Sequence, residues 1–187
     1  MTSRNHVNQK SLVNPSWKDS VAGEPLMAFS PYLSTRVNVL RAVADEVLGN
    51  LDQGFVTQIV DGSRIQRAEA LMWLWTLGAY EVVRTMCQAK VCFSQHLVQE
   101  LCELKTILAE VRMPAAKMEK PRRSPRTPIR SDRSPSGLDS ARKDLLVGDP
   151  SAPSVFARDV LARFDSVFSS IASNDILSPH GAAYAAK

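Results

Sequence analysis

The sequence predicts an all-α fold, an irregular four-helix bundle with a long central helix and a disordered basic Pro/Ser-rich loop before the last helix. Three observations indicate this fold. Apolar residues recur at helical spacing in four separate stretches, short alternating apolar and polar runs are scarce, and glycine is not enriched, with 8 residues in 187. A hydrophobic content of 44% beside 22% charged residues is ordinary for a single domain with a real core.

The chain divides by composition into four regions. The expected boundaries are 1–32 for an extended N-terminal arm, 33–118 for the helical core, 119–153 for a flexible basic loop, and 154–187 for the final core helix and a fraying tail. The arm holds three prolines and spaced aromatic and apolar residues. We expect these residues to pack on the bundle; the alternative is that they bind a partner.

The first helix is expected over about residues 35–50, after a start at Ser34 or Thr35. Its apolar residues stand at helical spacing: Val37, Leu40, Ala44, Val47, Leu48 and Leu51. Gly49 and Asn50 suit a helix end because both tolerate the left-handed conformation. The apolar piece that follows, Phe55 to Val60, is expected to be helical from its context alone.

The central helix is expected over about 64–92, with Ser63 as its N-cap. One helical face is apolar: Ile65, Ala68, Met72, Trp75, Ala79, Val82 and Met86. The block from Met72 to Leu77 is apolar on nearly every side, so we expect this helix to be buried all round by neighbouring helices. The block is too short to span a membrane, and charged residues flank it on both sides.

The third helix is expected over about 95–113 with Ser94 as its cap, which makes an αα-hairpin with the central helix. Its leucines and one valine form a seam like that of a coiled coil: Leu97, Leu101, Leu104, Leu108 and Val111. Charged residues on the other faces, Arg112 among them, should be solvated, and Pro114 should end or kink the helix near Met113. Because the join has neither glycine nor proline, one long bent helix remains an alternative.

The region from 119 to 153 contains six prolines, and large apolar residues nearly vanish until Leu145, so we expect a disordered or loosely held loop that cannot bury enough surface to become ordered. Residues 117–133 carry seven basic and two acidic side chains, a net charge of +5 in a chain of net charge +4. Five arginines are the candidate polyanion contacts: Arg122, Arg123, Arg126, Arg130 and Arg133. The last helix, over about 154–172, has a strong apolar face that includes Phe164.

Four residues of the central helix form a candidate polar pocket: Arg67, Tyr80, Glu81 and Arg84. In one interpretation they make surface or interhelical ion pairs, and in the other they line a pocket in which Arg84 contacts an anion. Three cysteines without a C-x-x-C pair indicate buried thiols in a reducing compartment. Although Cys92 and His96 are four residues apart, no second ligand pair is visible, so no metal and no cofactor is expected.

The segment Leu77-Gly78-Ala79-Tyr80-Glu81-Val82-Val83-Arg84-Thr85 resembles the central helix of HEPN-type helical bundles, some of which are ribonucleases. The family's catalytic pattern, an arginine followed four to six residues later by a histidine, is absent. No phosphate-binding loop, nucleophile elbow or zinc-protease motif is present in the sequence either.

The sequence therefore predicts a non-catalytic helical interaction protein that binds a protein partner or forms a homo-oligomer, in the cytoplasm and without a membrane. A first alternative is a protein that associates non-specifically with nucleic acid through the basic loop. A second is a HEPN-like helical nuclease that lacks the usual motif.

Overall fold

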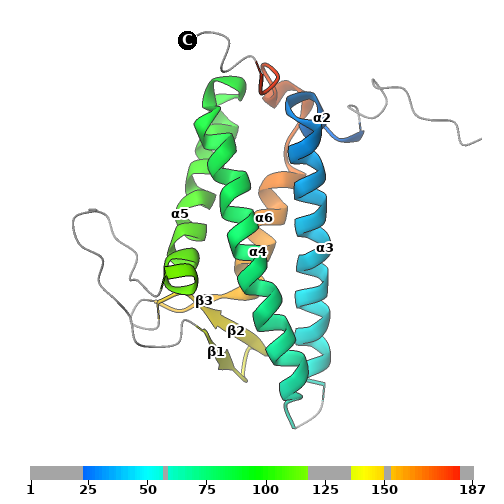
Figure 1. Ribbon diagram of the computed structural model, residues 1–187, viewed down its shortest axis with the longest axis vertical. Helices are drawn as coiled ribbons and strands as arrows, with labels where there is room; N and C mark the ends of the chain where they lie inside the picture. Colours follow the sequence, from blue (N-terminus) through cyan, green and yellow to red (C-terminus); the bar gives the residue numbers. More distant parts are fainter. Residues whose placement is uncertain (1–22, 57–58, 118–135, 150–152, 182–187) are drawn as a thin grey trace, which may run out of the picture.

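The computed structural model describes residues 23–56, 59–117, 136–149 and 153–181. Within this part, four long helices run along the molecule: α3 (Pro31–Gly54), α4 (Gly62–Gln88), α5 (Gln95–Lys117) and α6 (Ala157–Ser169). Figure 1 shows α4 between α3 and α5, with α6 behind it. The prediction of a mainly helical protein is confirmed. The prediction of an all-α protein is wrong, because a small three-stranded sheet lies at one end of the helices.

The N-terminal part of the chain is helical earlier than predicted. A short helix, α2 (Leu26–Phe29), precedes α3, whose first residue is Pro31. The Ser30 side chain caps α3 by accepting a hydrogen bond from the Leu33 N–H at 3.3 Å, and proline suits the first helical position because it lacks an N–H. The expected extended arm is therefore wrong for residues 23–32, and residues 1–22 lie outside the described residues.

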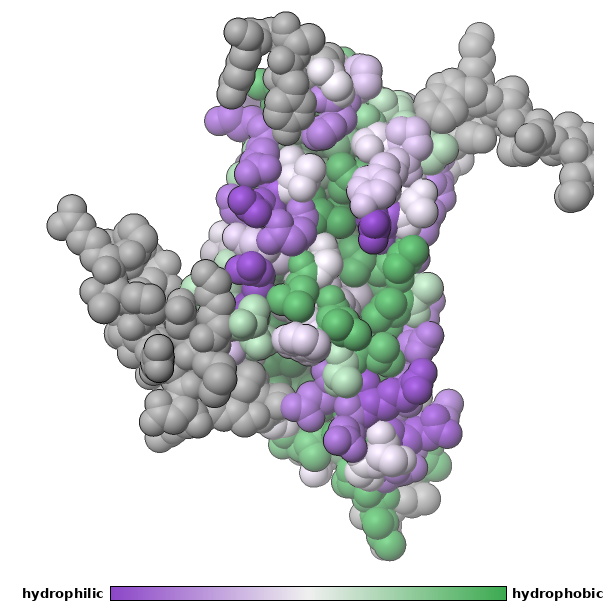
Figure 2. Space-filling model, in the orientation of Figure 1, coloured by the Kyte–Doolittle hydropathy of each residue, from purple (hydrophilic) through white to green (hydrophobic). Residues whose placement is uncertain are grey.

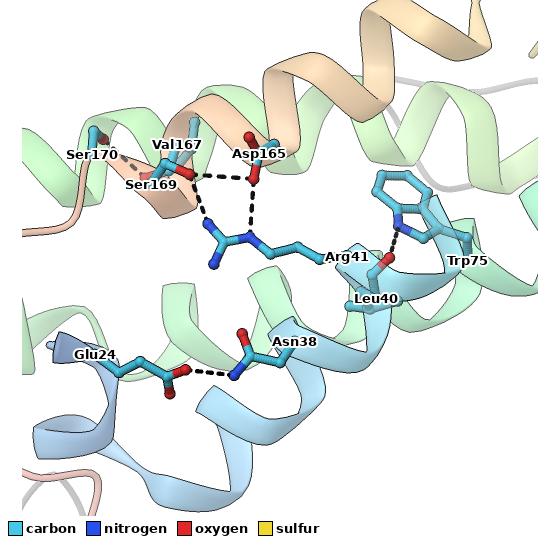
Figure 3. Close-up of polar contacts among 9 residues, drawn as sticks. All are labelled: Glu24, Asn38, Leu40, Arg41, Trp75, Asp165, Val167, Ser169 and Ser170. Atoms are coloured by element: carbon cyan, nitrogen blue, oxygen red, sulfur yellow. Dashed lines mark hydrogen bonds and ion pairs between the residues drawn. The ribbon is translucent and has the colours of Figure 1, made fainter. Parts of the chain in front are cut away.

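Helix α3 also continues past Asn50 to Gly54, so its predicted end is wrong. Leu51 is completely buried and extends the apolar face of α3 by another turn. This burial favours a helix that continues past Gly49 and Asn50, which tolerate a helix end but do not require one. A polar contact joins α3 to α6, since Arg41 donates to the Asp165 carboxylate at 2.9 Å and to the Ser169 hydroxyl at 2.8 Å (Figure 3).

Helix α4 supplies much of the core. The predicted apolar face is buried at every position: Ile65, Ala68, Met72, Trp75, Ala79, Val82 and Met86. The Trp75 indole N–H donates to the Leu40 carbonyl oxygen at 3.0 Å, which fixes the central helix against α3 (Figure 3). The N-cap is Asp61, whose carboxylate accepts from the N–H groups of Ser63 and Arg64, so the cap predicted at Ser63 is wrong.

The outward side of α4 is not buried, contrary to the prediction. Trp73 is 47% exposed and Leu74 is 55% exposed. Neighbouring helices lie beside and behind α4 but not in front of it (Figure 1). An apolar run of six residues was therefore not enough to indicate burial on all sides.

The αα-hairpin of α4 and α5 is confirmed. A short 3₁₀ turn, Lys90–Cys92, separates the two helices, and the Ser94 hydroxyl accepts from the Leu97 N–H at 3.3 Å as a cap. One long bent helix is therefore wrong, and all five residues of the predicted seam are buried. The predicted end near Met113 is also wrong, because α5 runs through Pro114 to Lys117. The helix tolerates Pro114 because this residue lies close to the helix end, where its missing N–H removes only one helical hydrogen bond.

The second part of the expected loop is a sheet. Strands β1 (Ser136–Asp139), β2 (Asp144–Val147) and β3 (Val155–Phe156) pair antiparallel in that order, and α6 begins after β3 at Ala157. The expected loop is thus wrong for 136–149, and 118–135 and 150–152 lie outside the described residues.

The buried side chain of Asp144 joins this sheet to α6. Its carboxylate accepts from the N–H of Leu145 at 2.8 Å and from the N–H of Arg158, in the first turn of α6, at 3.3 Å. Burial raises the pKa of Asp144 above its ordinary range, which the two backbone donors counteract. The sheet therefore sets where the last helix starts.

The segment after α6 packs across the end of the α4–α5 hairpin, so the expected fraying of the tail is wrong for residues 173–181. The Leu177 N–H donates to the Cys92 carbonyl at 2.8 Å, and the His180 N–H donates to the Phe29 carbonyl at 2.9 Å. The Asp175 carboxylate accepts from the Ser94 hydroxyl and, at 3.0 Å, from the Ala172 N–H.

We expect the hydrogen bonds accepted by the Asp175 carboxylate to make the stability of the protein sensitive to acid. Hydrogen bonds from Ser94 and Ala172 hold the pKa of Asp175 below its usual value of 3.8. A carboxyl with a lowered folded-state pKa contributes stability above its unfolded-state pKa, and this is lost as the pH falls through the folded value. Urea unfolding at about pH 6 and about pH 3 should therefore show a smaller acid-induced loss in Asp175→Asn than in the wild type. An equal loss in both proteins would show that the hydrogen bonds accepted by the Asp175 carboxylate do not stabilise the folded protein.

Candidate functional site

An open groove of about 610 Å³ lies between the first half of α3 and the second half of α4. Its buried lining is apolar and includes Leu33, Leu40 and Val82. Gly78 lets the two helices approach each other closely at one end of the groove. A Cβ atom at this position would stand only 3.1 Å from the Leu40 Cδ2 atom. The size falls within the range of sites that bind small molecules or anchor side chains.

An exposed apolar patch adjoins the groove. Its members are Val39, which lines the groove and is 53% exposed, and the outward residues Trp73 and Leu74 of α4. Leu74 precedes Gly78 by four residues, so the two share one side of α4. Figure 2 shows apolar surface across the middle of this side of the molecule, with hydrophilic surface above and below it and a second apolar area at the lower tip. We call the groove and this patch together the α3–α4 face.

The structure brings three of the four predicted pocket residues together. Arg84 pairs with the Glu81 carboxylate at 2.9 Å, and Arg112 of α5 approaches the same carboxylate at 3.8 Å. The Arg112 guanidinium also lies 4.6 Å from the centre of the Tyr80 ring. Arg67 stands apart from this cluster and pairs with Glu46 of α3 at 3.3 Å.

Arg112 was not among the predicted site residues. Its side chain is only 23% exposed, so the prediction that it would be solvated is wrong. The antiparallel hairpin places the end of α5 opposite Tyr80, and this register cannot be obtained from the spacing of residues along one helix.

The groove part of the α3–α4 face carries excess positive charge. Glu81 is the groove's carboxylate, and Arg84 and Arg112 both pair with it. Arg36 also lines the groove, with its guanidinium over the ring of Tyr32 at 4.7 Å, and it makes no ion pair with a carboxylate among the described residues. Three guanidinium groups thus stand near one carboxylate, which favours an anionic group on whatever binds here.

The three cysteines differ in exposure: Cys92 is buried, Cys87 is half-buried and Cys102 is exposed, so the expectation of buried thiols is wrong for Cys102. Burial and the neighbouring Cys102 thiol raise the pKa of Cys87 to about 11, so its nucleophilic thiolate is scarce at neutral pH. Cys92 is buried whereas His96 is exposed, so this pair does not share a site. Across the described ranges, no group of three or more His, Cys, Asp or Glu side chains is placed to hold a metal ion.

The five candidate polyanion contacts lie in 118–135, outside the described residues, so nucleic-acid association stays a prediction from the sequence. In the part of the chain that the structure describes, no helix combines the length and the apolar character needed to cross a membrane.

Comparison of the chain with protein-family models, with curated proteins and with solved structures found no match. The resemblance of Leu77–Thr85 to HEPN-type bundles is therefore supported by no family or fold relationship.

Proposed function

We propose that this protein is a non-catalytic interaction protein that binds another protein chain through the α3–α4 face. The observation that carries the proposal is the exposed apolar patch beside a groove whose buried lining is also apolar. Fully burying a large apolar side chain contributes about 1.5–3 kcal/mol. Covering Trp73, Leu74 and Val39 is therefore a substantial driving force for association.

The shape of the face favours a protein partner over a small molecule. The groove is partly open to solvent, and exposed apolar side chains are present beyond it on the outward side of α4, Leu74 among them. A ligand confined to the groove would leave Trp73 and Leu74 in water. Partner side chains that enter the groove while the partner backbone lies across the patch would cover both, as helices do in apolar grooves.

The polar groups of the groove suit binding better than catalysis. The Glu81 carboxylate is engaged by two guanidinium groups, that of Arg84 at 2.9 Å and that of Arg112 at 3.8 Å, and is thereby committed to ion pairs within the protein. The Thr85 hydroxyl donates to the Glu81 carbonyl at 2.8 Å and is thereby committed within its own helix. Tryptophan and arginine, both present on this face, are enriched in protein interfaces.

Site-specific photo-cross-linking tests the proposal. A photoreactive amino acid in place of Val39 should give a discrete protein adduct in cells of the source organism, because this side chain lines the groove at its exposed rim. The matched control carries the same amino acid in place of Ala162, an exposed small residue on α6. The control should give no such adduct. Equal labelling from both positions, or no adduct from Val39, would count against the proposed function.

A further inference from the structure

We infer that the partner presents an acidic amphipathic helix, whose apolar side chains cover the groove and patch and whose carboxylates meet the guanidinium of Arg36. This inference rests on the proposed function and adds the chemistry of the partner. It depends on which charges of the α3–α4 face are already neutralised within the protein and which are not.

Carboxylates on the face are already engaged. Glu46 pairs with Arg67 at 3.3 Å, and Glu81 is shared by Arg84 and Arg112. Arg36 is exposed and contacts Tyr32, a neutral side chain one turn earlier in α3. A carboxylate from the partner would complete the pairing at Arg36, whereas a lysine or arginine there would meet like charge.

The same pairing pattern disfavours a second copy of this chain as the occupant. A second copy would bring the same face, on which Glu46 and Glu81 are already bound by arginines. Such a dimer would add another unneutralised Arg36 without adding a free carboxylate. The charges are thus complementary to an acidic partner and not to the protein itself.

The dimensions of the face fit a short helix. Leu74 and Arg84 are ten residues apart on α4, which corresponds to about 15 Å at the helical rise of roughly 1.5 Å per residue. A partner helix of three turns therefore spans the patch and the groove. Apolar residues at i, i+4 and i+7 would face the protein, with acidic residues beside them.

Two labelled peptides provide the probe. Each has roughly 15 residues, so that a helix can form on the face, with leucine at i, i+4 and i+7. One carries glutamate and the other lysine at the flanking positions. In fluorescence anisotropy the acidic peptide should bind the full chain roughly two- to fivefold more tightly than the basic peptide, the range expected for an exposed charge pair.

Arg36→Glu should abolish or reverse this preference, because it replaces attraction by repulsion for the acidic peptide. Lys143→Glu is the control; it makes the same charge change at an exposed residue of the β1–β2 turn, at the opposite end of the molecule from the groove, and should keep the wild-type preference. Circular dichroism of both variants checks that each is folded.

Equal affinity for the two peptides, tighter binding of the basic peptide, or binding of neither would overturn the inference. So would a dimer of the free protein that is lost in Leu74→Arg, since it would assign the face to a second copy. These results are distinguishable from failure of the proposed function, because the cross-linked adduct from Val39 would persist if the face binds a protein of different chemistry.

Discussion

Replacement of Trp75 by alanine is expected to lower the free energy of unfolding by about 3–5 kcal/mol. The side chain is 1% exposed, and its ring packs edge-on against Phe164 with 5.1 Å between ring centres. Removing it leaves a large cavity and takes the indole donor away from the buried Leu40 carbonyl at 3.0 Å. Against a typical total stability of about 5–15 kcal/mol, this change should leave little folded protein under mildly destabilising conditions.

Urea unfolding of Trp75→Ala measures this effect, and Trp73→Ala is the matched control. The control removes the same side chain two residues away, where it is 47% exposed, so we expect a loss of less than about 1 kcal/mol. The two variants thus compare the inward and outward sides of one helix. Similar losses for both would show that α4 is oriented differently.

Phe164→Ala is expected to have the second large effect, also about 3–5 kcal/mol. Phe164 is 1% exposed and touches the ring of Phe168 in its own helix, at 4.4 Å between centres, as well as Trp75. Through this ring, α6 packs against the buried side of α4. Ser166→Ala, at an exposed position of α6, should change the unfolding free energy by no more than about 0.5 kcal/mol.

Combining Phe164→Ala with Trp75→Ala tests whether the two rings stabilise each other. Residues in contact show coupling of about 0.5–3 kcal/mol in a double-mutant cycle. We expect the double variant to lose less than the two single losses together, because each single variant already removes the contact. Strict additivity would contradict the observed packing of α6 on α4.

Helical periodicity was sufficient to predict two of the apolar faces that form the core. The apolar spacing of the central helix and the leucine seam of α5 placed every residue of those two faces correctly, because burial of such a face follows directly from 3.6 residues per turn. Helix ends were less accurate. Ser30 followed by Pro31 is a helix start, yet within a proline-containing stretch it was interpreted as part of an extended arm.

The sheet was missed because its strands are too short to show periodicity. β1 and β2 have four residues each and β3 has two. They are held by pairing with one another and by the Asp144 carboxylate, which accepts hydrogen bonds from the backbone N–H groups of Leu145 and of Arg158, 14 residues away. No local pattern in the sequence predicts such a contact.

The candidate site was predictable only where it lies on one helix. Tyr80, Glu81 and Arg84 share a helical side, and spacing alone grouped them. Arg36 and Arg112 come from other helices, and their positions depend on how α3 and α5 pack against α4. The exposure of Trp73 depends on the same packing, since an apolar sequence does not reveal how many helices surround it.

The most direct test of an association face that is separate from the core is Leu74→Arg, measured in two ways. Leu74 is 55% exposed, so the free energy of unfolding should stay within about 1 kcal/mol of the wild type. The photo-cross-linked adduct from Val39 should be lost in the same variant, because a partner that covers the patch would have to bury the new charge. An adduct that persists at wild-type yield would contradict the account.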